Sequence, residues 1–174
     1  MDLEAPADGW YVWMGVALVS VATMGVALGL PSGPPPDANA AANAIDRVAG
    51  SAYEGDASYE HDARFYWVDG ERIAMKNDDG VAKATLAYGP AVPVEEDTKL
   101  EAMLHGRDIT DEYSPQWHPT RKSEREQFHE DVEDAIARVD SADPEWRGAD
   151  GRLDVRVVDY TWGGEQHRAV LVDM

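Results

Sequence analysis

The longest apolar stretch of the chain runs from Trp10 to Leu30. It contains 21 residues without a charged side chain, and a helix of that length rises about 31 Å, close to the hydrocarbon thickness of a bilayer. Trp10, Tyr11 and Trp13 crowd the first turn, where aromatic side chains meet a membrane interface. The pattern predicts a transmembrane helix, and with it a single-pass protein of the cell membrane in contact with the lipid bilayer.

A cleaved signal peptide is the alternative interpretation of this stretch. Signal peptides combine a basic leader with a shorter apolar region, whereas this leader holds Asp2, Glu4 and Asp8 and no Lys or Arg. We therefore favour an uncleaved anchor. Gly25 and Gly29 form a small-xxx-small pair, which lets two helices approach closely. A homo-oligomer formed through the span is thus a further hypothesis.

A proline-rich spacer, PSGPPP, follows the apolar stretch. Consecutive prolines hold the backbone near polyproline II, so the spacer would lift a domain off the surface, which favours an extracytoplasmic position. The positive-inside rule favours the opposite orientation, on the weak basis of Arg47 alone. Asp37 is placed to cap a helix through about Gly50, with alanines along one face.

The pattern changes to period two from Tyr59 onward. Asp69-Gly70 and Asp79-Gly80 are hairpin turn signals between short apolar runs. They predict a three-stranded antiparallel meander with strands at approximately Ala63–Val68, Glu71–Lys76 and Val81–Tyr88. The stretch AYGPAVPV ends this meander, because its two prolines cannot continue a central strand.

The sequence from Asp97 onward predicts two helices and a hairpin. Helical patterns cover Asp97–His105 and Arg121–Val139, with a loop at 107–119 between them, and LDVRVVDYTW and HRAVLV flank a turn at Gly163-Gly164. The expected fold class is α+β: an N-terminal transmembrane helix, then a small antiparallel sheet (three-stranded meander plus C-terminal hairpin) packed by one or two helices. The expected divisions are 1–30 for tail and anchor, 31–58 for spacer and short helix, and 59–174 for the domain.

The net charge and the absence of cysteine exclude several classes of function. The chain carries 34 acidic against 15 basic residues, a net charge of −19, and it has no cysteine. This balance argues against nucleic-acid binding, which needs a basic face. The absence of cysteine excludes disulfides, cysteine nucleophiles and zinc ribbons. The Asp-rich, Lys-poor composition resembles that of proteins from salt-loving archaea, because concentrated salt screens repulsion between carboxylates.

No motif specifies a chemistry. There is no HExxH, no nucleophile elbow, no P-loop and no dinucleotide fingerprint. Glu126-x-x-His129 has the spacing of a di-iron helix, but a second such helix is missing, and we predict no metal or cofactor and no catalytic residue. Trp117 and Trp146 fall in predicted loops, where each is either a partner-binding anchor or the edge of the core.

Several segments resemble an uncharacterised haloarchaeal family of small single-span proteins: EAPADGWYVWMGVAL, PPPDANAAANAIDRVA, LAYGPAVPV and LDVRVVDYTWGG. The resemblance implies an envelope role beside type IV pilus-like assembly or secretion systems and transfers no catalytic residue. The sequence analysis thus predicts a membrane-anchored, non-catalytic interaction protein with unidentified membrane or envelope partners. A minor pilin-like filament subunit is the alternative, and an anchored enzyme or metal-binding module is the least favoured.

Overall fold

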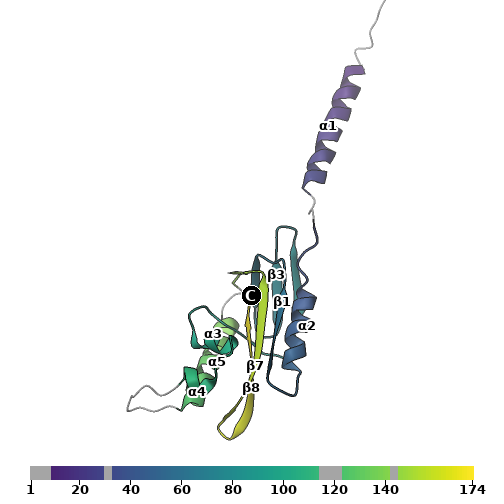
Figure 1. Cartoon of the computed structure of the whole chain (residues 1–174). Helices are drawn as coiled ribbons and strands as arrows, with labels where there is room; N and C mark the ends of the chain where they lie inside the picture. The colour runs from purple at the N-terminus through teal and green to yellow at the C-terminus, as the bar shows by residue number, and fades with distance from the viewer. Residues whose placement is uncertain (1–8, 30–32, 114–122, 142–144) are drawn as a thin grey trace, which may run out of the picture. The chain divides into compact units, whose positions relative to one another are not determined.

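The computed structural model describes residues 9–29, 33–113, 123–141 and 145–174 (Figure 1). The chain divides into two compact units, Met1–Pro34 and Pro35–Met174, which are treated separately below.

The first unit contains helix α1, Gly9–Leu28. Among the described residues, no helix combines the length and the apolar character needed to cross a bilayer. This finding overturns two expectations: the transmembrane helix over Trp10–Leu30 and the single-pass location in the cell membrane. The helix itself is present, and it closes with Gly29 donating its backbone N–H to the carbonyls of Gly25 and Val26 at 3.2 and 3.1 Å.

The second unit contains two four-stranded sheets. The first has the order β1-β7-β8-β5, made by Gly55–Glu60, Arg152–Trp162, Glu165–Asp173 and Ala91–Pro93. The second has the order β4-β3-β2-β6, made by Val81–Thr85, Arg72–Lys76, Phe65–Val68 and Arg147–Gly148. Only the β5–β8 pair is parallel. The predicted meander and the predicted hairpin are both confirmed, but they belong to two sheets rather than one.

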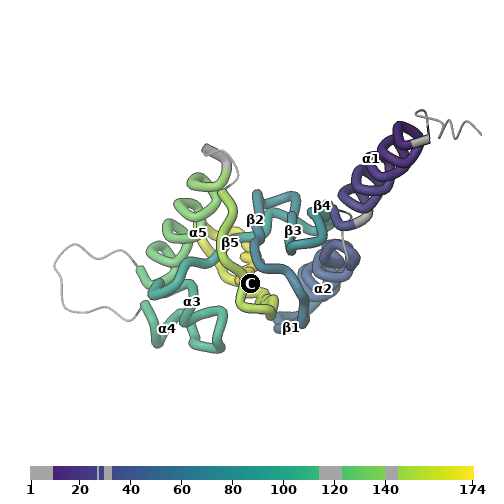
Figure 2. The backbone as a smooth tube through the Cα atoms, turned by 90° about the horizontal axis from the view of Figure 1, so that it is seen from above, coloured from purple at the N-terminus to yellow at the C-terminus, as the bar shows by residue number. Residues whose placement is uncertain are grey.

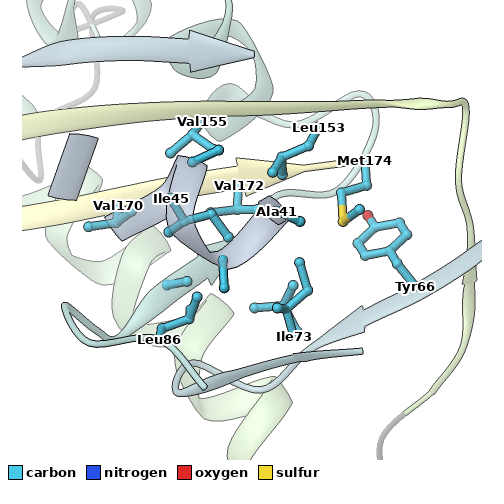
Figure 3. Close-up of a cluster of buried hydrophobic side chains, with 14 of the residues drawn as sticks. Ala41, Ile45, Tyr66, Ile73, Leu86, Leu153, Val155, Val170, Val172 and Met174 are labelled. Carbon is cyan, nitrogen blue, oxygen red and sulfur yellow. The ribbon is translucent and has the colours of Figure 1, made fainter. Parts of the chain in front are cut away.

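Helix α2, Ala38–Ala49, packs between the inner faces of the two sheets. The Asp37 side chain accepts a hydrogen bond from the N–H of Ala40 at 2.9 Å, which confirms the predicted cap. Alanines let the helix approach both sheets closely, and Ile45 fills the centre. Figure 3 shows Ala41 and Ile45 of α2 between Val172 of the first sheet and Ile73 of the second.

A second core lies on the opposite face of the first sheet. Three helices cover that face: α3, α4 and α5, at Lys99–Leu104, Ile109–Glu112 and Glu124–Ser141. Seen from above, they lie on one side of the strands and α2 lies on the other (Figure 2). Phe128 and Val132 of α5 pack against Val158 and Leu171 of the β7–β8 hairpin. The apolar stripe predicted for the long helix therefore lies against a sheet.

Three strands and one short helix escaped the sequence analysis. β5 includes Pro93, which is compatible with its place at the edge of the sheet, where a missing N–H costs no ladder bond. β1 is built of small and polar residues, and β6 is only two residues long. α4 occupies part of the predicted loop at 107–119, because Asp108 caps it by accepting from the N–H of Thr110 at 2.9 Å.

Candidate interaction surfaces

Helix α1 exposes its apolar side chains around its whole circumference. Twelve large apolar residues of α1 are between 43% and 77% exposed. Trp10 and Tyr11 contact each other with ring centroids 4.5 Å apart, and Trp13 is 75% exposed. Thr23, one of its few polar residues, donates its hydroxyl back to the carbonyls of Val19 and Ser20. The helix therefore offers a contact surface without charge.

Small residues form a seam along α1. Gly15 and Ala22 are seven residues apart, Gly25 follows three residues later, and Gly29 four after that, so helical spacing places all four on one side. A methyl group added at Gly15 or Gly25 would meet no atom within 4 Å. The seam includes both glycines named from the sequence, and its open space would admit a second helix.

A different surface lies on the outer side of the second sheet. Tyr66 and Ile73 point into the core, so the residues that alternate with them point outward. We call this surface the lysine–tryptophan face, and it comprises Phe65, Trp67, Arg72, Ala74, Lys76, Val81, Lys83 and Trp146. Strand register arranges it in rows: Trp67, Ala74 and Lys83 pair across three strands, and Phe65, Lys76 and Val81 form the next row.

Basic side chains contact the indole rings of the lysine–tryptophan face. The Arg72 guanidinium and the Lys83 ammonium lie 5.7 and 5.6 Å from the Trp67 ring centroid. The Trp146 ring meets Trp67 edge to face at 6.3 Å, and the Lys76 ammonium lies 5.9 Å from the Trp146 centroid. These distances are within the range of cation–π attraction. The contacts leave Trp67 only 6% exposed and Trp146 36% exposed.

The cations of this face differ in their ionic partners. The Asp69 carboxylate accepts from the Arg72 backbone N–H and from Nε, both at 2.8 Å, and from Nη2. This hydrogen bonding raises the pKa of the Arg72 guanidinium above its usual value. Among the described side chains, no carboxylate lies within ion-pair distance of Lys76 or Lys83. Lys76 and Lys83 therefore contact indole rings but no described carboxylate, and Lys76 pairs across the strands with exposed Phe65 and Val81.

Of the two tryptophans that the sequence singles out as partner-binding candidates, the structure describes one. Trp146 lies on the lysine–tryptophan face, where it covers Trp67 while keeping part of its own surface exposed. Trp117 lies outside the described residues. Lys76 and Lys83 were not predicted as site residues, because only the β3–β4 register brings these two residues together. The signal that would have found them is their rarity, since the chain has only four lysines.

A third cluster joins α5 to the β7–β8 hairpin through aromatic rings. His129 stacks on Trp162 at 4.0 Å, and its Nδ1 lies 2.9 Å from the Tyr160 hydroxyl. Burial, with the nearby Glu133 carboxylate, raises the pKa of Tyr160. His167 Nε2 is buried without a hydrogen-bond partner among the described residues. In the part of the chain that the structure describes, no three His, Asp or Glu residues are grouped to hold a metal ion.

The chain matches the model of a known protein family. Residues 4–158 match the model of DUF7283, a family of unknown function. The chain belongs to this family. No curated protein and no solved structure matches the chain significantly. Membership of DUF7283 agrees with the uncharacterised family expected from the sequence, and it assigns no activity to any of the three clusters.

Proposed function

We propose that this DUF7283 protein is a non-catalytic assembly protein, in which α1 packs against the α1 helices of further copies. The observation that carries the proposal is the exposure of α1. Its twelve large apolar side chains, at roughly 100 Å² each, expose on the order of 1,000 Å², against about 800 Å² that each partner contributes to a standard interface. Leaving that surface in water opposes the hydrophobic effect.

A second copy is the occupant best supported by α1 itself. Packing α1 against α1 buries no charged side chain, since the helix has none. The seam of Gly15, Ala22, Gly25 and Gly29 allows two backbones to approach, and the large side chains beside it supply the contact area. All 15 Lys and Arg residues lie after Pro34, so the first unit brings no positive charge to the contact.

The setting of this assembly is inferred from composition and resemblance. The excess of aspartate over lysine supports a salt-rich environment, in which the repulsion between units of net negative charge is screened. A pilin-like filament subunit is the second candidate, supported by the same exposed apolar helix, which would pack in the filament core. The resemblance to haloarchaeal envelope proteins is the support for a role beside pilus-like systems.

The test is the oligomeric state of the full chain, measured by analytical ultracentrifugation in concentrated KCl. We expect concentration-dependent association that Gly25→Leu weakens by about tenfold, or about 1.4 kcal/mol, by blocking close approach of the helices. Ala17→Leu is the matched control, because helical spacing places Ala17 away from the seam. A chain that stays monomeric, that floats with lipid vesicles without self-association, or that responds equally to both variants would refute the proposal.

A further inference from the structure

The lysine–tryptophan face carries a second inference that is independent of α1. We propose that this face binds an extended acidic segment of a partner protein, with carboxylates at alternate positions. The starting observation is its charge. Two of the four lysines of a chain with net charge −19 stand here, and no described carboxylate compensates either of them. Two ammonium groups without a described ion-pair partner are complementary to a partner's carboxylates.

The spacing of the lysines defines the segment that fits. Lys76 of β3 pairs with Val81 of β4, and Lys83 is two residues further along β4 on the same side of the sheet. The two lysines are therefore diagonal neighbours, with backbones about 7 Å apart. In an extended chain, residues i and i+2 are also about 7 Å apart and point to the same side. An acid-x-acid segment thus presents one carboxylate to each ammonium.

Apolar surface beside the cations adds contact area for such a segment. Phe65 is 45% exposed and Val81 is 48% exposed, and the two flank Lys76 in one row. Trp146 adds a partly exposed indole at the side of this row. Cations between exposed aromatic and aliphatic side chains form a surface to which a carboxylate and a neighbouring apolar side chain can bind together.

The same geometry disfavours single-stranded nucleic acid. Base stacking needs an open ring face, but Arg72, Lys83 and Trp146 cover Trp67 and leave it 6% exposed. The net charge of −19 also repels a phosphate backbone, whose binding depends on many basic contacts. Two ammonium groups suit two carboxylates of a peptide better than a continuous row of phosphates.

The experiment compares labelled peptides by fluorescence anisotropy with the full-length protein at low salt. One peptide alternates Glu with Val, and the second has the same composition with its glutamates in one block. We expect tighter binding of the alternating peptide and a loss of about tenfold in the Lys76→Gln/Lys83→Gln variant, the scale of two exposed ion pairs. Lys76→Arg/Lys83→Arg should keep the affinity, which separates charge from folding.

Lys99→Gln is the matched control. The Lys99 ammonium lies 4.5 Å from the Tyr113 ring centroid, so this substitution removes the same charge and the same kind of contact away from the face. Unchanged binding in Lys99→Gln together with loss in the double variant supports the inference. Equal binding of the two peptides, equal loss in Lys99→Gln, or tighter binding of an oligothymidylate of the same charge would overturn it.

Discussion

Ile45 is the residue through which α2 holds the two sheets together, and its truncation tests that arrangement. Its side chain is 0% exposed, between Val172 of one sheet and Ile73 of the other (Figure 3). Ile45→Ala removes three aliphatic carbons, which at about 0.8 kcal/mol each corresponds to about 2.4 kcal/mol of lost burial. The cavity left between two sheets adds about 1–2 kcal/mol, because close-packed surroundings relax only in part.

Helix propensity works in the opposite direction. Alanine is the better helix former, which stabilises the folded variant by about 0.4 kcal/mol. We therefore expect Ile45→Ala to lower the free energy of unfolding by about 3–4 kcal/mol, a large share of the 5–15 kcal/mol typical of a domain. Ile45→Val should cost only about 1 kcal/mol, since it removes one carbon. Asn43→Ala, on the exposed side of α2, should stay within about 0.5 kcal/mol of the parent.

The assay is equilibrium unfolding in urea at fixed KCl, followed by circular dichroism. Urea is preferred to guanidinium because guanidinium is a salt and would screen the charge of −19. Hydrogen exchange adds a second readout: amides of β3 and β7, in different sheets, should lose protection together in Ile45→Ala. A cost no larger than that of Ile45→Val, or loss of protection in one sheet alone, would refute the role of α2 as the joint.

Four further substitutions test other features of the second unit. Arg168 binds both oxygens of Asp159 and two carbonyls at the end of α2, so Arg168→Met should cost about 1–2 kcal/mol in urea unfolding. Arg168 also lowers the pKa of Asp159. Because both side chains are one third exposed, the ion pair should stabilise the folded protein by at most about 1 kcal/mol above pH 4. This stabilisation should be lost as the pH falls further, and a pH series on Asp159→Asn should not show that loss. Tyr113→Phe removes the hydroxyl donated to Asp131 at 2.8 Å and should cost about 1 kcal/mol by thermal unfolding. Gly106→Ala places a side chain at φ +101° and should cost at least about 1 kcal/mol in the same assay.

Local signals predicted most of the second unit. The Asp37 cap, the alanine periodicity of α2 and the two Asp-Gly turns each act within a few residues, and the structure follows all of them. The parallel pairing of β5 with β8 could not be predicted in this way, because it joins Ala91 to Val170 and depends on tertiary packing. The division into two sheets has the same origin, since the β7–β8 hairpin pairs with β1 and β5 rather than with the meander.

The candidate surfaces show where sequence patterns stop being informative. The apolar run at α1 is evident in the sequence, but its interpretation as a transmembrane helix is wrong. Trp146 was named from its loop position, whereas its neighbours on the lysine–tryptophan face are set by strand register. Tyr66 and Trp67 are neighbours in β2, and Tyr66 points into the core while Trp67 lies on the opposite side of the sheet. Register, not composition, then placed Lys83 beside Trp67.

Added salt should have opposite effects on association through α1 and on peptide binding to the lysine–tryptophan face. Association through α1 buries apolar side chains between acidic units, so added KCl should strengthen it by screening repulsion, as the Debye length falls from about 10 Å at 0.1 M to about 3 Å at 1 M. Binding of an acidic segment to Lys76 and Lys83 is attraction between exposed charges, so the same salt should weaken it. Sedimentation and peptide anisotropy measured on one KCl series should therefore give opposite slopes. Parallel slopes would mean that both events use one surface, and the separate roles of α1 and the lysine–tryptophan face would have to be abandoned.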